Sequence, residues 1–349
     1  MGDGPATGVR VLIIGAAGML GRKLAASLVL RRRIGSTPIS HLTLVDRVAP
    51  PSPVGSPPGE VDAFEVDAFE VDIVDPGTPG RLIRPRPDVV FHLAAIVSGE
   101  AEQDRALGYA VNLDATRAIL EAIRDEGAHR VYRPRLVYAS TAAVFGAPLP
   151  DRIGDDFLTA PATSYGTQKA IGELLINDDS RRGSLDGISL RLPTICVRPG
   201  TPNRAASGFF SNIIREPLVG RSAVLPVDDA LRHWFASPRS AVGFLEHAAA
   251  LDTERLGTRR AVNMPGVSAT VADQLEALRR IAGEAAVDLI RREPDPEIAG
   301  MVSTWPQDFD PQRALDLGFV AEDSFDDIVR VHIEDELGGQ LHLHAGRDG

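Results

Sequence analysis

Short apolar runs alternate with longer amphipathic stretches through the first 200 residues of the chain. The run VRVLII (9–14) is rich in β-branched residues and precedes the helix-like stretch KLAASLVLRRR (23–33). Similar apolar runs follow at 41–47, 88–95, 133–141 and 187–197, and residues 108–127 have apolar positions at helical spacing. Strands that alternate with helices predict an α/β fold, a doubly wound parallel sheet with helices on both faces.

The alternation fades after about residue 197. Segments 209–220 and 270–283 keep helical patterns, but loop-like stretches separate them. We therefore expect one domain over residues 8–197 and a smaller mixed domain over 198–340, some of whose segments return to the first. Residues 341–349 are expected to form a disordered tail.

A Pro- and Gly-rich stretch between residues 48 and 80 contains the five residues EVDAF twice in tandem (60–69), followed by EVD. Two copies do not make a repeat architecture. We interpret them as a local duplication that lengthens a surface loop, because loops tolerate extra length at a small entropic cost. We expect it to carry no chemistry.

Composition excludes several function classes. The formal net charge of −11 over 349 residues argues against nucleic-acid binding, which needs a surplus of Lys and Arg. Cys196 is the only cysteine, which is typical of reduced, cytoplasmic proteins. No apolar run approaches the roughly 20 residues that span a bilayer, so the sequence predicts a soluble protein without a membrane partner.

Three glycines mark the first strand–helix junction, GAAGMLG. Gly15 permits a tight turn, Gly18 allows a pyrophosphate to approach the backbone, and Gly21 lets the helix pack closely on the strand. Met19 and Leu20 begin the helix, whose free N–H groups attract an anion. The motif predicts a Rossmann-type dinucleotide site.

Asp46 ends the second predicted strand. A carboxylate there can accept hydrogen bonds from both hydroxyls of an adenosine ribose, and it repels a 2′-phosphate. The neighbouring Arg47 could hold a 2′-phosphate, which leaves NADP as the alternative. NAD is the predicted cofactor.

Tyr165 and Lys169 lie four positions apart at the start of a predicted helix. Ionising a free tyrosine at pH 7 costs about 4 kcal/mol, and an ammonium one helical turn away stabilises the phenolate. The strand before this helix ends in two hydroxyls, Ser140 and Thr141. Thr141 is the first choice to hold a substrate oxygen and Ser140 the second.

These motifs together resemble the extended short-chain dehydrogenase/reductase family, which includes NAD-dependent epimerases and dehydratases. GAAGMLG, Asp46, HLAA, NLDAT, STAAVFG, YGTQK and RLPT follow the family's order across residues 9–197. The resemblance implies that Thr141, Tyr165 and Lys169 are catalytic and that Asn112 supports a proton relay. It further implies cofactor contacts at Asp72 and Ile73 beside the adenine, at Leu93, Ala94 and Ala95 beneath the cofactor, and at Pro193 and Thr194 near the carboxamide.

The second half is similar to one group within that family, which oxidises the C2 hydroxyl of a four-carbon sugar acid with NAD. A carboxylate substrate needs a cation, and Arg198, Arg204 and Arg232 follow the last strand of the first domain. Arg198 and Arg232 are the leading candidates, and Ser98 could bind a substrate hydroxyl. Thr201 and Phe235 stand where that group has a lysine and a histidine, which leaves the exact sugar acid open.

Three other functions remain open: a nucleotide-sugar epimerase or dehydratase, an enzyme like L-threonine dehydrogenase, and a cofactor-sensing regulator without chemistry. An intact tyrosine–lysine pair argues against the regulator. The resemblance also suggests a homodimer formed by helices within 101–126 and 164–180. No metal site is predicted, because hydride transfer with NAD needs no metal, and we interpret His342 and His344 as part of the disordered tail.

Overall fold

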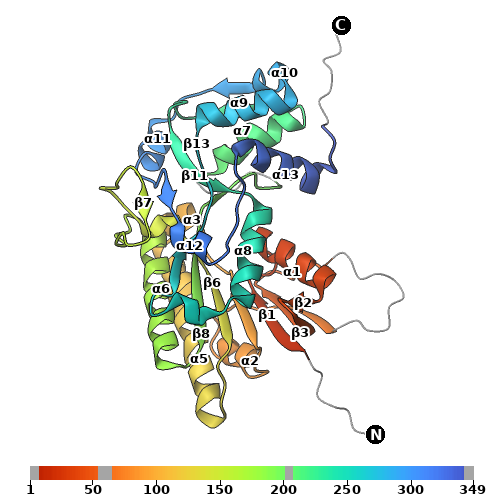
Figure 1. Cartoon of the computed structure of the whole chain (residues 1–349), viewed down its shortest axis with the longest axis vertical. Coiled ribbons are helices and arrows are strands. Elements are labelled where there is room, and N and C mark those ends of the chain that lie inside the picture. The colour runs from red at the N-terminus through yellow and green to blue at the C-terminus, as the bar shows by residue number, and fades with distance from the viewer. Residues whose placement is uncertain (1–7, 54–64, 201–206, 342–349) are drawn as a thin grey trace.

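An eight-stranded sheet forms the centre of the computed structural model, which describes residues 8–53, 65–200 and 207–341 (Figure 1). Its strand order is β12-β8-β6-β5-β1-β3-β2, with β4 also paired to β3, and all pairs except β2–β3 are parallel. The strands are β1 (Val9–Ile14), β2 (Arg33–Ile34), β3 (Thr37–Asp46), β4 (Glu65–Glu70), β5 (Val89–His92), β6 (Arg135–Thr141), β8 (Asp186–Leu192) and β12 (Ala261–Asn263).

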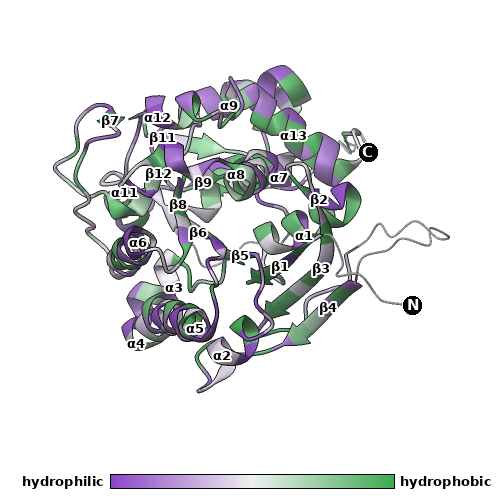
Figure 2. Ribbon diagram, turned by 60° about the horizontal axis from the view of Figure 1, so that its bottom comes forward, coloured by the Kyte–Doolittle hydropathy of each residue, from purple (hydrophilic) through white to green (hydrophobic). Residues whose placement is uncertain are grey.

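Helices cover both faces of this sheet, which confirms the predicted doubly wound α/β fold. One face carries α1 (Met19–Arg31) and α8 (Pro238–Ala250), and the other carries α2 (Thr78–Ile83), α5 (Ala115–His129) and α6 (Ser164–Arg182). Both faces of β1 are buried: Val11 and Ile13 pack toward α1, and Leu12 and Ile14 toward α5. Successive side chains of a strand point to opposite faces, so a strand buried on both sides is an unbroken apolar run (green in Figure 2).

The second unit lies over the carboxyl ends of the sheet strands and has its own apolar core. A three-stranded sheet of order β13-β11-β9 joins it to the first unit, because β9 follows β8 after one residue. Its elements are β9 (Thr194–Ile195), α7 (Gly208–Leu218), β10 (Ala223–Leu225), β11 (Arg232–Ala236), β13 (Val267–Thr270), α9 (Val271–Ala282), α10 (Glu284–Val287), β14 (Ile290–Arg292), α11 (Pro296–Val302) and α13 (Phe325–Leu337). Between β11 and β13 the chain returns to the first unit as α8 and β12.

Short elements connect these units. They are α3 (Ser98–Gln103), α4 (Arg105–Gly108), the π-helix η1 (Tyr109–Asp114), the 3₁₀ helices η2 (Ala142–Val144) and η3 (Thr253–Leu256), the strand pair β7 (Ile153–Gly154) and β15 (Phe309–Asp310), and α12 (Gln312–Asp316). None of the helices in the described ranges is long and apolar enough to cross a membrane. Thr201, Arg204 and the predicted tail beyond Leu341 lie outside the described residues.

The interpretation of the EVDAF repeat as a surface loop was wrong for its second copy. Residues 65–70 form β4, which pairs in parallel with β3, and His41 of β3 lies 3.2 Å from both Glu65 and Asp67. An edge strand is held by backbone hydrogen bonds and needs no buried face, so most of β4 is exposed and its sequence has no strong apolar signal. The first copy lies outside the described residues.

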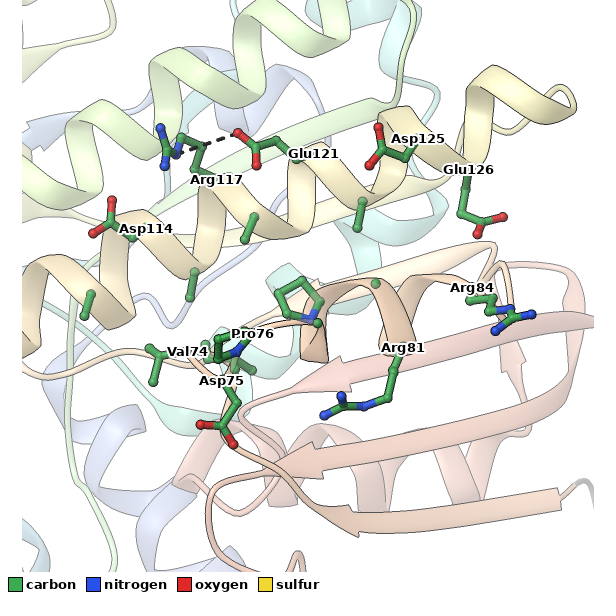
Figure 3. A pocket seen from close by; sticks show the side chains of 18 residues that line it. Val74, Asp75, Pro76, Arg81, Arg84, Asp114, Arg117, Glu121, Asp125 and Glu126 are labelled. Carbon is green, nitrogen blue, oxygen red and sulfur yellow. Dashed lines mark ion pairs between the residues drawn. The ribbon is translucent and has the colours of Figure 1, made fainter.

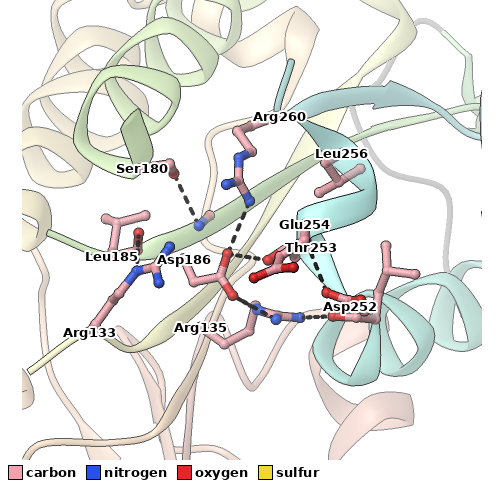
Figure 4. A network of polar contacts seen from close by, with 12 residues as sticks. Arg133, Arg135, Ser180, Leu185, Asp186, Asp252, Thr253, Glu254, Leu256 and Arg260 are labelled. Atoms are coloured by element: carbon pink, nitrogen blue, oxygen red, sulfur yellow. Dashed lines mark hydrogen bonds and ion pairs between the residues drawn. The ribbon is translucent and has the colours of Figure 1, made fainter. Parts of the chain in front are cut away.

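A polar network at the amino ends of β6 and β8 fastens α8 to the sheet (Figure 4). The Asp186 carboxylate accepts hydrogen bonds from Arg135 at 2.7 and 3.1 Å, from Arg260 at 3.0 Å and from Thr253. Arg135 also donates to the carbonyls of residues 248, 249 and 251 at the end of α8. Burial raises the pKa of Asp186, but the Thr253 hydroxyl and the two arginines outweigh it, so the net shift is downward.

We expect Asp186→Asn to lower the free energy of unfolding by about 2 to 3 kcal/mol at pH 7, because it leaves two partly buried arginines without their carboxylate. The folded-state pKa of Asp186 is lowered, so its contribution is complete above the unfolded value of about 4 and is lost as pH falls through the folded value. The loss should therefore shrink in acid. Urea unfolding of both proteins at several pH values measures it, and Asp178→Asn, which removes exposed pairs on α6, should change stability little.

Candidate active site

The glycine turn between β1 and α1 packs against the HLAA backbone and leaves the N-terminus of α1 without a side-chain cap. Gly15 has φ +95°, and a Cβ there would lie 2.5 Å from the backbone nitrogen of Ala94. Gly18 caps α1 without a side-chain hydrogen bond, and no acidic residue occupies the first turn, which includes Met19, Leu20 and Gly21. The amide groups of this 13-residue helix therefore face a space without a side-chain acceptor, which fits a pyrophosphate.

Two carboxylates follow the ends of neighbouring strands β3 and β4. Asp46 ends β3, and its Oδ2 accepts a hydrogen bond from Ala17 N at 2.9 Å, which holds it beside the glycine turn. Asp72 follows β4 and accepts from Val74 N at 3.0 Å. The arrangement suits a ribose diol at Asp46 and a base beside Asp72.

A groove of about 850 Å³ runs from Ile73 between α2 and α5 (Figure 3). Its walls carry charges of both signs, and Arg117 pairs with Glu121 at 3.8 Å across one turn of α5. Ile73 itself is buried. The groove therefore adjoins the predicted adenine position without a surplus of positive charge.

The segment after β5 passes beneath the glycine turn. Leu93 N and Ala94 N both donate to the carbonyl of Ile14, at 2.8 and 2.9 Å, and the chain continues through Ala95 to Ser98 at the start of α3. The predicted residues of HLAA are therefore adjacent to Gly15. The substrate role of Ser98 stays a prediction.

Asn112 lies in the π-helix η1 and is fully buried. Its side chain accepts from Ile96 N at 2.8 Å and donates to Ile96 O at 3.0 Å and to Gln168 Oε1 at 2.7 Å. Gln168 lies between Tyr165 and Lys169 on α6. Asn112 therefore links the HLAA segment to α6, and its relay role stays a prediction.

The two hydroxyls at the end of β6 point to different partners. Ser140 is buried and donates to Glu173 Oε1 at 2.5 Å, and Glu173 also pairs with Arg191 at 2.8 Å. Thr141 is partly exposed, its hydroxyl accepts a hydrogen bond from Ala143 N at 3.1 Å, and it acts to lower the pKa of Tyr165. Consecutive strand residues face opposite sides, so Thr141 is turned away from Glu173, and its substrate role beside Tyr165 stays a prediction.

Tyr165 and Lys169 start α6, whose N-cap Thr163 accepts from Gly166 N at 3.0 Å. Lys169 Nζ lies 6.0 Å from the centre of the Tyr165 ring and donates to Ala139 O at 2.9 Å. Burial lowers the pKa of Lys169 to about 7, against the opposing effect of Glu173. Burial raises the pKa of Tyr165 to about 12, although Arg198 and the Thr141 hydrogen bond lower it.

The sequence predicts that Lys169 lowers the pKa of Tyr165, and in this structure Arg198 is a second cation that lowers it, while the role of Lys169 stays a prediction. Without ligand, the ammonium of Lys169 is turned toward Ala139 O and the ring of Tyr138, 4.5 Å away. Lys169 remains placed on the same face of α6 as Tyr165.

The two candidate arginines differ in their surroundings. Arg198 donates from Nε to Ile195 O at 3.0 Å and from Nη2 to Ser207 Oγ at 2.8 Å, and no carboxylate of the described residues pairs with it. Arg232 is partly exposed and lies with Ser268, at 3.3 Å, and Asp273, at 3.9 Å. The electrostatic contact with Tyr165 belongs to Arg198.

His233 is a residue of this region that the sequence did not single out. It is buried on β11, and its Nε2 lies 2.6 Å from the hydroxyl of Thr194, which follows Pro193 at the start of β9. Thr141 pairs with Leu192 in the main sheet, so Thr194 lies just past the same edge. A single histidine in a strand has no sequence signal that could have identified this contact.

We expect Asp46→Ala to raise the Michaelis constant for NAD and to narrow the preference over NADP, because the change removes the ribose acceptor and the charge that repels a 2′-phosphate. Steady-state kinetics with both cofactors measures this. Asp72→Ala is the matched control at the neighbouring strand end and should leave the preference unchanged. Equal use of both cofactors by the wild-type protein would contradict the role of Asp46.

Thr141→Ser should stay close to wild-type turnover, and Thr141→Val should lose about 10²-fold or more, because only the second change removes the hydroxyl beside Tyr165. Ser140→Ala tests the alternative. It should reduce stability, because it removes the hydrogen bond from Ser140 to Glu173. Thr141→Val should lower turnover by the same factor whether or not Ser140→Ala is also present.

Comparison with known proteins identifies the family of this chain. The NAD dependent epimerase/dehydratase family matches residues 11–236. The chain is 46% identical to a D-erythronate dehydrogenase of Cupriavidus necator, over 94% of this chain and 98% of that one, and 42% identical to a D-erythronate dehydrogenase of Haemophilus influenzae, over 94% and 100%. A solved structure of a nucleoside-diphosphate-sugar epimerase from Agrobacterium tumefaciens has 56% identity and a TM-score of 0.92, over 98% of this chain and 99% of that one.

The family match covers more than half of the chain, and the glycine turn, Asp46 and the tyrosine–lysine pair lie inside it. The predicted resemblance, the NAD cofactor and the assignment as an enzyme are thereby confirmed. The chain belongs to the NAD dependent epimerase/dehydratase family.

Proposed function

We propose that the protein oxidises the C2 hydroxyl of D-erythronate to 2-dehydro-D-erythronate with NAD. The two similar dehydrogenases span nearly the whole chain. The structural observation that carries the proposal is Arg198, a partly buried guanidinium that lacks a carboxylate partner among the described residues and lowers the pKa of Tyr165. A partly buried cation favours an anion, and a sugar acid supplies one beside the hydroxyl that reacts.

The residues divide the chemistry between them. Arg198 holds the substrate carboxylate, and Thr141 hydrogen-bonds the C2 oxygen and keeps it next to Tyr165. Tyr165, as the phenolate, takes the C2 hydroxyl proton, and Lys169 adds positive charge that favours this phenolate. When bound, NAD accepts the hydride that leaves C2.

The test is NADH formation, followed by absorbance, on D-erythronate, its neutral polyol erythritol, L-threonine and UDP-sugars. We expect oxidation of D-erythronate and little activity on erythritol, because erythritol lacks the carboxylate. Equal activity on D-erythronate and erythritol would contradict the proposal that Arg198 binds the substrate carboxylate. If L-threonine were the only compound of this panel to give NADH, the protein would be a threonine dehydrogenase and the proposal would be wrong.

A second candidate is a nucleotide-sugar epimerase, which the similarity to the Agrobacterium tumefaciens epimerase favours. An epimerase regenerates its cofactor within each turnover and produces no net NADH. Chromatographic analysis of the UDP-sugars after incubation distinguishes the two, since interconversion without NADH would support the epimerase.

We also propose a cytoplasmic homodimer that pairs through α5 and α6. Leu174 on α6 is 68% exposed, and an apolar side chain on the outer face of a long helix suits a helix-to-helix contact. Light scattering on a sizing column gives the mass in solution. Leu174→Glu should shift a dimer toward monomer, whereas a monomeric wild-type protein would contradict the proposal.

A further inference from the structure

His233 connects the edge of the active site to the second unit. Its ring stacks on Phe210 of α7, with centroids 5.2 Å apart and planes inclined by 1°, and it lies 5.5 Å from Trp305. Nε2 faces Thr194 Oγ1 at 2.6 Å, and the backbone of Pro306 acts on the ring to raise its pKa. The imidazole is therefore fixed by its stack on Phe210 and by its contact with Thr194.

The charge state of this ring follows from its surroundings. Burial lowers the pKa of His233 to about 3, the Pro306 carbonyl acts in the opposite direction, and Arg198 lowers it further. A neutral imidazole has one N–H, and a carbonyl can only accept. The contact at Nε2 allows either tautomer, and the effect of the Pro306 carbonyl, which can only accept, favours a proton on Nδ1. In that tautomer Nε2 accepts from the Thr194 hydroxyl.

This chain of hydrogen bonds determines what Thr194 can offer on its other side. A hydroxyl has a single O–H donor and two acceptor lone pairs. Once the donor is used on His233, the oxygen can only accept. Thr194 lies next to the strand edge that carries Thr141, where the reacting end of a dinucleotide meets the substrate.

We propose that His233 is a positioning residue that makes Thr194 an obligatory hydrogen-bond acceptor for the amide N–H₂ of the nicotinamide carboxamide. The proposal goes beyond the choice of substrate and rests on the proposed function only for the identity of the cofactor. An acceptor on Thr194 orients the carboxamide. If the carboxamide were flipped, its carbonyl oxygen would face the Thr194 oxygen, and two acceptors cannot form a hydrogen bond.

The first measurement concerns the protein without ligand. Nitrogen-15 NMR of the histidine side chains, with His233→Gln to assign the signal, should show a neutral ring protonated on Nδ1 between pH 5 and pH 9. A ring protonated on Nε2, or one that titrates in this range, would overturn the proposal, because Thr194 could then donate.

The second measurement compares the binding of NADH and of its 3-acetylpyridine analogue, in which a methyl group replaces the amide nitrogen and no N–H can be donated. The wild-type protein should prefer NADH. His233→Phe keeps the stack on Phe210 but frees the Thr194 hydroxyl to rotate, so we expect the preference to narrow by about 3- to 10-fold, the usual worth of one hydrogen bond. Fluorescence titration gives both dissociation constants without any substrate.

Thr194→Val should narrow the preference equally, and adding His233→Phe to it should cause no further change. Thr194→Ser should restore the preference, because it keeps the hydroxyl. If His233→Phe weakened both dinucleotides alike while Thr194→Val removed the preference, His233 would have only a structural role and the proposal would fail. The substrate panel remains independent of this result, since binding is measured here without a substrate.

Discussion

Replacing Tyr165 by phenylalanine should lower turnover by about 10²- to 10⁴-fold, the usual worth of a positioned acid–base group. The change keeps the ring and removes only the atom that receives the C2 proton. NAD binding should change little, because in the proposed mechanism the hydroxyl serves the substrate. Steady-state turnover and a direct titration with NADH separate the two effects.

The pH dependence gives this prediction a second readout. A base that must be ionised makes turnover rise with pH, and burial raises the pKa of Tyr165 to about 12 in the protein without ligand. We expect the pH profile of turnover to give an apparent pKa below 12, since Arg198 and Lys169 favour the phenolate. The residual turnover of Tyr165→Phe should not rise with pH, because this variant has no phenol to ionise.

Tyr132→Phe is the matched control. Its hydroxyl donates to Pro87 O at 2.9 Å, far from the Thr141 edge of the sheet. It should reduce stability slightly and leave turnover and its pH profile intact. Near-normal turnover by Tyr165→Phe would assign the base to another group.

Arg198→Ala should weaken substrate binding by about 2 to 5 kcal/mol, the cost of truncating one partner of a buried charge pair. The Michaelis constant for the sugar acid rises accordingly. Turnover should also fall at a fixed pH, because the guanidinium lowers the pKa of Tyr165, and the pH profile should move upward. Arg198→Lys keeps the charge without the planar fork and should give an intermediate result.

Arg232→Ala serves as the comparison, since Arg232 was an equal candidate by sequence. Its side chain is 42% exposed and lies 3.9 Å from Asp273, so its loss should have a small effect. A larger loss of binding in Arg232→Ala than in Arg198→Ala would reverse the assignment. Unfolding curves of both variants exclude a general loss of structure.

Motifs with local geometry were predictable from the sequence. The glycine turn, Asp46 at a strand end, and Tyr165 one helical turn from Lys169 depend on spacing within one or two adjacent elements, and the structure has them in those elements. The doubly wound sheet follows from the same kind of signal, because apolar runs separated by helical periodicity leave few other arrangements.

Edge strands and mixed segments were less predictable. The second EVDAF copy becomes β4 through backbone pairing with β3, and such pairing has no hydrophobic pattern when the strand is exposed. The return of α8 and β12 to the first sheet depends on contacts between residues far apart in the chain, which local periodicity does not report.

The sequence by itself determined the fold class and the cofactor and predicted Tyr165 as the base, because each depends on residues held at set spacing by one strand, turn or helix. Only the tertiary structure decided that Ser140 is turned toward Glu173, that Arg198 and not Arg232 acts on the pKa of Tyr165, and that His233 meets Thr194. These choices depend on which face of a strand is turned inward and on what distant segments bring there, and burial then sets the charge of each group.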